Sequence, residues 1–155
     1  MLLGKDGDRY TAWHIAALFD GLMALETLRS LAEELELNLD EMLLAKTEGG
    51  QTAFHLAAQR KHTEILWELW VWVAKSQMNP SELRKTLLLA KNEDGYTAWH
   101  RAAISDGLET LETSWSLSKE AEIKLDEFLL VKTEQGQTAF HMAAKENHIE
   151  ILQKL

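Results

Sequence analysis

The sequence predicts an all-α protein in which four helix-turn-helix units stack side by side as a solenoid. A seven-residue phrase recurs four times with small changes: TAWHIAA at 11–17, TAFHLAA at 52–58, TAWHRAA at 97–103 and TAFHMAA at 138–144. These phrases start 41, 45 and 41 residues apart, and self-similarity at such a period is typical of stacked repeats. Each phrase follows a polar, glycine-containing stretch and precedes apolar residues at helical spacing, as a helix-turn-helix unit would.

Each unit has the same predicted order of elements. The polar stretches 5–9, 47–50, 92–95 and 133–136 predict turns, because glycine permits the positive φ that a tight turn requires. The threonine after each turn predicts the N-cap of a short first helix; these residues are Thr11, Thr52, Thr97 and Thr138. After a loop, the second helix carries apolar residues at helical spacing, for example Ile65, Leu66, Leu69 and Val73.

These units resemble ankyrin repeats. The family's phrase is a turn ending in Gly-x, then Thr-Pro-Leu-His-x-Ala-Ala, a loop and a second helix, and its threonine, histidine and alanine pair recur in all four copies. Alanine replaces the proline, and tryptophan or phenylalanine replaces the leucine. The resemblance implies an ankyrin-type helix-turn-helix solenoid with β-turn or hairpin-like tips.

The units are longer than ankyrin repeats, which usually have about 33 residues. The additional residues follow the second helix, at 32–40, 74–84 and 118–126. They predict an extended outer helix followed by a short helical turn, which Asn79 would cap with Pro80 at its first position, and which Asp40 and Asp126 would open in their units. We expect one domain over residues 1–155, with approximate units 1–42, 43–86, 87–128 and an incomplete 129–155. The abrupt ends suggest a piece of a longer array, either natural or engineered.

The units also form a duplicated pair. Units one and three share tryptophan in the phrase, whereas units two and four share phenylalanine and a His-x-Glu-Ile-Leu helix start. Aligned at an offset of 86 residues, which brings Thr11 onto Thr97, residues 1–69 and 87–155 are identical at more than half of their positions.

Composition and charge exclude several classes of protein. The hydrophobic content of 46% is too high for a disordered chain. The net charge of −9, with scattered acidic residues, argues against a nucleic-acid partner, which requires clustered lysine and arginine. No segment approaches the roughly 18 continuous apolar residues of a membrane span. Because the chain has no cysteine and no signal-peptide core, we expect a cytoplasmic protein without a membrane partner.

The recurring histidines raise the hypothesis of a metal site. They are His14, His55, His100 and His141. Because each recurs at one position per unit, and no His-Glu-x-x-His motif or cysteine pair accompanies them, we expect structural side chains and no metal or other cofactor. The resemblance implies that each one hydrogen-bonds around its own turn and the neighbouring unit. His62 and His148 precede second helices, where packing in the loop is the expected role.

No catalytic constellation is present, so we expect a protein that is not an enzyme. Gly-x-Ser-x-Gly, phosphate-loop and dinucleotide motifs are all missing from the sequence. Trp67 aligns with Glu26, Glu112 and Gln153, so we expect an exposed tryptophan there, either as a contact site or by chance.

The resemblance implies that a partner binds the concave surface formed by the turn tips and the first helices. The variable positions lie near the turn glycine, just before the threonine and just after the alanine pair. In this chain they are Asp8, Tyr10, Leu18, Phe19, Glu48, Gln51, Gln59, Arg60, Glu93, Tyr96, Ile104, Ser105, Glu134, Gln137, Lys145 and Glu146. Exposed tyrosine and phenylalanine are enriched in binding hot spots. The alternative for Leu18 and Ile104 is that they cover the loop.

We therefore predict a non-enzymatic scaffold that binds a protein partner through this surface. The alternative is a structural or spacer segment of a longer ankyrin array, or a chain that self-associates through exposed terminal units. Large uncovered apolar surfaces mark interaction sites, and a head-to-tail contact between two different ends could propagate.

Overall fold

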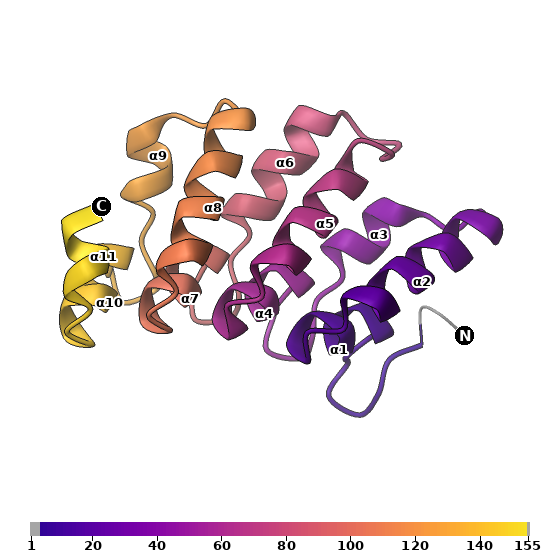
Figure 1. The fold of residues 1–155 in the computed structure, drawn as a ribbon, viewed down its shortest axis with the longest axis horizontal. Helices are drawn as coiled ribbons and strands as arrows, with labels where there is room; N and C mark the ends of the chain where they lie inside the picture. Colours follow the sequence, from indigo (N-terminus) through magenta and orange to yellow (C-terminus); the bar gives the residue numbers. More distant parts are fainter. Residues whose placement is uncertain (1–3, 155) are drawn as a thin grey trace.

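The protein is a row of helices in three layers (Figure 1). The computed structural model describes residues 4–154, and no strand occurs within this range. The inner layer consists of α1 (Ala12–Leu18), α4 (Ala53–Arg60), α7 (Ala98–Ile104) and α10 (Ala139–Lys145). The outer layer consists of α2 (Leu22–Glu34), α5 (Thr63–Val73), α8 (Leu108–Glu120) and α11 (Ile149–Lys154). A third helix follows in three units, as α3 (Leu39–Leu44), α6 (Pro80–Leu89) and α9 (Leu125–Leu129).

The units lie side by side in chain order. Figure 1 shows them from indigo at one end of the row to yellow at the other, with the two ends of the chain at opposite ends of the row. We call α1–α3 the first unit, α4–α6 the second, α7–α9 the third and α10–α11 the fourth. This all-helical arrangement with extended outer helices is the predicted solenoid.

The inner helices pack closely because their contact faces are small. α4 packs against both α1 and α7, and α10 packs against α7. The second alanine of the pair is fully buried in the first three units, at Ala17, Ala58 and Ala103. The aromatic residues of the phrase fill the space between layers: Trp13 and Phe54 are each 1% exposed. Interaxial distances depend on the side chains at the contact, so alanine permits the close approach.

The outer helices continue the core. α5 packs against both α2 and α8. The apolar positions predicted for the second helix, Ile65, Leu66, Leu69 and Val73, are at most 1% exposed. A helix of this kind is stabilised by burial of its apolar face against its neighbours.

The third helices differ in part from the expected short turns. Asn79 is the N-cap of α6 and accepts hydrogen bonds from Ser81 N and Glu82 N, as predicted, but α6 has ten residues. α3 begins at Leu39 with Asn38 as its N-cap. The expected opening residue, Asp40, instead accepts a hydrogen bond from the backbone N–H of Met78, at 3.0 Å.

The turn tips are joined to one another along the row. Within a tip, the N–H of Gly50 donates to Thr47 O, and the N–H of Thr47 donates to Gln51 O. Between tips, backbone N–H groups donate to the preceding unit: Glu48 to Asp8, Glu93 to Gly49, and Glu134 to Asp94, at 3.0 to 3.2 Å. These bonds hold the tips in register.

Among the described helices, none is long and apolar enough to cross a membrane.

Candidate protein-binding surface

The candidate surface consists of the tips and the first helices. The motif histidines lie on these first helices, near their starts. In each unit the backbone N–H of the threonine donates to Nδ1 of the histidine, at 3.1 to 3.2 Å. The threonine hydroxyl lies 2.8 to 2.9 Å from the same nitrogen. Because an amide can only donate, Nδ1 is the acceptor and Nε2 carries the proton of the neutral ring.

Three of the four histidines also reach the next unit. Their Nε2 atoms donate to backbone carbonyl oxygens: His14 to Ala45 at 3.0 Å, His55 to Tyr96 at 2.9 Å, and His100 to Val131 at 3.1 Å. One side chain therefore fixes both the start of a first helix and the approach of the chain to the next tip.

Burial keeps these imidazoles neutral. Desolvation is the largest cause that lowers the pKa of His55 and of His100, each to about 4, and it also lowers the pKa of His14. Hydrogen bonds from the rings to backbone carbonyls act in the opposite direction but are smaller. A buried imidazolium would also lose the acceptor at Nδ1, so the proton is disfavoured twice.

The two other histidines join neighbouring units through their loops. His62 Nδ1 lies 2.9 Å from Ala17 O, and His148 Nδ1 lies 2.9 Å from Ala103 O. Within residues 4–154, no group of three or more His, Cys, Asp or Glu side chains is placed to hold a metal ion.

The sixteen predicted surface positions divide evenly by exposure. Eight are exposed: Asp8, Phe19, Glu48, Arg60, Glu93, Glu134, Lys145 and Glu146. The other eight are partly buried: Tyr10, Leu18, Gln51, Gln59, Tyr96, Ile104, Ser105 and Gln137. The exposed group contains seven charged residues and one aromatic residue, so the accessible part of this surface is mainly charged.

The tyrosines before the threonine pack inward. The Tyr10 ring meets the His14 ring edge-on at 6.1 Å, and the Tyr96 ring meets His100 in the same way at 6.0 Å. The guanidinium of Arg101 lies 4.8 Å from the centre of the Tyr96 ring. Both rings therefore support the histidines and present only part of their surface to solvent.

Of the apolar positions after the alanine pair, only Phe19 is exposed. Phe19 is 70% exposed, whereas Leu18 and Ile104 are partly buried and pack against the core. On α1, Ile15 is 41% exposed. Met23 on α2 is also exposed, at 75%.

Sequence reasoning missed Ile15 and Met23, and it missed a row of lysines at the tips. Nζ of Lys46 donates to Lys91 O at 2.9 Å, and Nζ of Lys91 donates to Lys132 O at 2.7 Å. The available signal was that each of these lysines precedes the threonine of the phrase by the same number of residues. Their positive charges lie next to Glu48 and Glu93 in a shallow groove, so the tips are not uniformly acidic.

Trp67, on α5, is 39% exposed. Its exposure is that expected from the polar residues at the equivalent positions.

Comparisons with known proteins agree with this geometry. The family model for the ankyrin repeat matches residues 49–71 and 135–155, which include the tip glycines Gly50 and Gly136 and the helices α4 and α10. No curated protein matches the sequence. A chain in the crystal structure of the yeast ribosomal protein Rps3 in complex with its chaperone Yar1 has a similar fold, with a TM-score of 0.74 and 21% identity. The match covers 92% of this chain and 87% of that chain.

Ankyrin repeats generally mediate contacts between proteins and are typically non-enzymatic. The two segments that match, 49–71 and 135–155, carry the threonine–histidine pairs and tip glycines described above, so these segments are ankyrin repeats.

Proposed function

We propose that this chain is a non-enzymatic scaffold that binds a protein partner across the turn tips and the ends of the first helices. The observation that supports this proposal most directly is the hydrogen bonding between tips. A backbone N–H of each later tip donates to a backbone carbonyl of the tip before it. This register presents exposed side chains of successive units in a rigid row. A preorganised surface loses less conformational entropy on binding than a mobile one.

The side chains in the row differ from unit to unit. The exposed tip residues among the predicted surface positions are Asp8, Glu48, Glu93 and Glu134, all acidic, whereas the position at the end of the first helix carries Phe19, Arg60, Ser105 and Glu146. Acidic tips beside basic and aromatic residues favour a partner of mixed charge with an apolar anchor. Electrostatic complementarity of this kind sets specificity and association rate more than affinity.

The solved structure with a similar fold supports a role in protein contacts, because it contains two different proteins in one complex. The chaperone and ribosomal protein named there belong to that complex, and we do not assign either role to this chain.

The experiment is affinity capture from a cell extract with two matched variants. In the first variant, the eight exposed surface residues are exchanged among themselves, so composition and net charge stay the same. In the second variant, eight exposed residues of the outer layer and third helices are exchanged in the same way. We expect proteins captured by the wild-type chain to be lost with the first variant and kept with the second. Capture that survives the first exchange would contradict the proposal.

A second candidate, self-association, rests on Ile15, Phe19 and Met23, which are 41%, 70% and 75% exposed at one end of the row. Contacts that use this end with a different surface of another copy would be heterologous and could propagate. Sedimentation velocity over a hundredfold concentration range tests it: association should weaken when Phe19 and Met23 are replaced by serine. A monomeric boundary throughout would exclude this candidate.

A further inference from the structure

An apolar strip lies on the exposed side of α5, in the second unit. Trp67 is 39% exposed, and Val71, one turn later on the same helix, is 51% exposed. Residues four apart lie on one face of a helix, so the two side chains form one strip. α5 packs against α2 on one side and against α8 on the other. The strip therefore lies inside the row of helices, and its exposure is a property of α5 itself.

The repeated units show that the fold does not require apolar residues in this strip. The first and third units have polar residues at both equivalent positions: Glu26 and Glu112 in place of Trp67, and Ser30 and Ser116 in place of Val71. Polar side chains are the usual composition of the exposed face of a helix. The strip is thus a particular feature of the second unit that packing does not explain.

The ring of Trp67 has no cation beside it, unlike the rings of the other tryptophans on α5 and α8. Those rings each have one at the following distances from cation to ring centre: Arg29 to Trp72 at 5.9 Å, Arg84 to Trp70 at 5.1 Å, and Lys119 to Trp115 at 5.4 Å. Among residues 4–154, no lysine or arginine is placed over Trp67 in this way. The face of an indole attracts cations, so Trp67 can accept one from another molecule.

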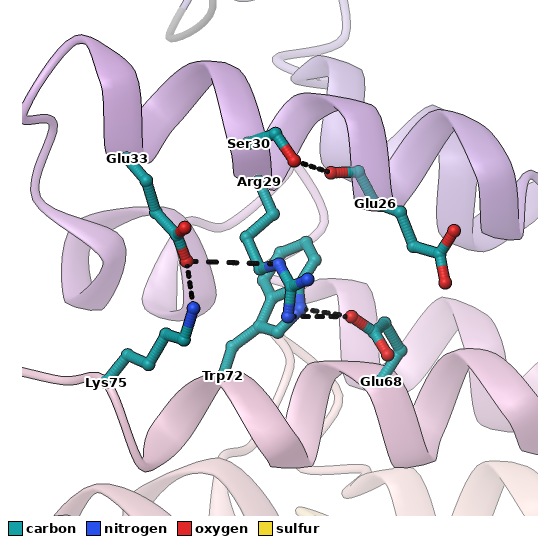
Figure 2. Close-up of polar contacts among 7 residues, drawn as sticks. All are labelled: Glu26, Arg29, Ser30, Glu33, Glu68, Trp72 and Lys75. Carbon is teal, nitrogen blue, oxygen red and sulfur yellow. Dashed lines mark hydrogen bonds and ion pairs between the residues drawn. The ribbon is translucent and has the colours of Figure 1, made fainter.

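Carboxylates lie near the strip, and Figure 2 shows which of them are already paired at the seam between α2 and α5. Glu33 pairs with Lys75 at 2.7 Å. Glu68 pairs with Arg29 at 3.2 Å. The carboxylate of Glu26 lies apart from both pairs (Figure 2), and it forms no ion pair within the described part of the chain. Glu26 is therefore available to a cation of a partner.

The start of α5 is also acidic. Glu64 is exposed, lies three residues before Trp67 and forms no ion pair with any described residue. It lines a hollow of about 290 Å³ whose lining also includes Asp20, Lys61 and Glu109. Three carboxylates there outnumber one lysine. On α8, Glu112 pairs with Lys154 at 2.7 Å, so it is not counted among the available carboxylates.

We propose that the strip of Trp67 and Val71 binds a basic helical segment of a partner protein. An arginine of that segment stacks on the indole between Glu26 and Glu64. An apolar side chain four residues away, about 6 Å along the helix, packs on Val71. A guanidinium can stack on an aromatic ring and pair with carboxylates at the same time, which makes arginine the suitable cation.

The charge of the whole chain favours the same partner. The net charge of −9 attracts a basic segment and repels a second copy of the chain. The strip lies on an outer helix, separate from the tips and the first helices. It is therefore a second interaction surface, beyond the one in the proposed scaffold function.

The test uses the whole chain labelled with ¹⁵N and a synthetic peptide of about 15 residues, near the length at which isolated helices form. The peptide is positively charged and carries one arginine with a leucine four residues later. In a matched peptide of the same composition, the arginine is exchanged with a glutamine on the opposite face of the helix. We expect the first peptide to shift the indole N–H signal of Trp67 and to leave that of Trp99, which is 2% exposed, unchanged. The matched peptide should bind about two- to fivefold more weakly, as expected when an exposed contact between a cation and an indole is lost.

Trp67→Gln shows whether the arginine acts through this ring. The fourth unit has glutamine at the equivalent position, Gln153, so we expect the variant to fold normally, which circular dichroism checks. It should bind the arginine peptide about two- to fivefold more weakly than the wild-type chain does. It should bind the matched peptide as the wild-type chain does, because the second change removes a contact that is already lost.

A pair of charge changes tests the carboxylates. Glu26→Gln combined with Glu64→Gln should weaken binding of the arginine peptide about two- to fivefold, as expected for exposed ion pairs. Glu82→Gln combined with Glu127→Gln changes the net charge by the same amount at exposed residues of α6 and α9. This matched control should weaken binding less, because its carboxylates lie outside the strip.

Four results would overturn the inference. They are no shift of the Trp67 signal with millimolar peptide, equal binding of the two peptides, an equal effect of the two pairs of glutamate changes, or self-association that Trp67→Gln abolishes. The last result would assign the strip to a second copy of the chain. The variant with exchanged tip residues should bind the peptide normally. The outer-layer exchange in the capture experiment leaves Glu26, Glu64, Trp67 and Val71 in place, so the two proposals can fail separately.

Discussion

His55 of the second unit and Tyr96 of the third are joined by one hydrogen bond of 2.9 Å, from Nε2 of the imidazole to the backbone carbonyl. The same ring accepts from Thr52 N–H at 3.2 Å through its other nitrogen. His55 has no exposed surface, so every polar atom of the ring depends on these partners. The side chain connects a helix start with a tip 41 residues away along the chain.

The first prediction is that His55→Ala lowers the free energy of unfolding by about 1–3 kcal/mol, because it leaves buried polar partners without a hydrogen bond. His141→Ala is the matched control. His141 is exposed, and within the described residues its ring bonds only to Thr138. We therefore expect a smaller loss there, measured by urea unfolding.

Adding a chelator tests whether the motif histidines are structural or bind a metal ion. EDTA should leave the melting temperature of the wild-type chain unchanged. A decrease of several degrees would assign the histidines to a metal instead.

The second prediction concerns pH. Because the folded pKa of His55 and of His100 is about 4, below the ordinary value of 6.5, the unfolded chain binds more protons between these values. Stability is then fully present above pH 6.5 and falls as the pH decreases toward 4. Between pH 7.5 and 5.5 we expect a loss of about 1 kcal/mol for each of the two histidines.

Urea unfolding at pH 7.5, 6.5 and 5.5 measures this loss, in a range where most carboxylates stay ionised. The double variant His55→Ala, His100→Ala should show a flatter profile, although it is less stable at every pH. A wild-type stability that is constant or increases toward pH 5.5 would contradict the assignment.

The third prediction compares two phenylalanines at equivalent positions. Phe54 is 1% exposed and packs near Trp70, with ring centres 6.4 Å apart, whereas Phe140 is only partly buried. Phe54→Ala should lower the free energy of unfolding by roughly 3–5 kcal/mol, as truncation of a buried aromatic residue does. Phe140→Ala should lower it less, because the ring already contacts solvent. Equal losses would indicate that another copy of the chain covers Phe140.

The inner layer could be predicted from the sequence because its signals are local. The phrase that starts at Thr52 contains a capping residue, a histidine within reach of it and two small residues, all within one turn or two of helix. α4 begins at Ala53 as the phrase predicts, and α1, α7 and α10 begin at the same position of their phrases.

The third layer was less predictable because its lengths depend on packing between units. Asn79 and Pro80 marked the start of α6, but its ten residues reflect burial of Leu83 and Leu87, one turn apart, against neighbouring helices. Asp40 is a residue type that often caps a helix. Its carboxylate instead accepts a hydrogen bond from the backbone N–H of Met78 in the next unit, 38 residues away. A local pattern contains no information about such a partner.

For the candidate surface too, the sequence predicted the positions but not how deeply each side chain is buried. The positions were chosen by their place in the phrase, which says nothing about the depth of each side chain. The Tyr96 ring contacts Arg101 and His100 and is partly buried, whereas Phe19 is 70% exposed.

The last prediction concerns the contact between successive tips. Gly95 has φ of +78°, and a Cβ at this position would lie 2.5 Å from Glu134 N in the next tip. Both the backbone conformation and the close approach exclude a side chain, so Gly95→Ala should lower the free energy of unfolding by about 1–3 kcal/mol. Gly49→Ala is the matched control, because a Cβ on Gly49 would meet no atom within 4 Å. Thermal unfolding of both variants, followed by circular dichroism, measures the difference. If Gly95→Ala were as stable as Gly49→Ala, the tips would have room to separate, and the rigid row on which the proposed binding surface depends would be wrong.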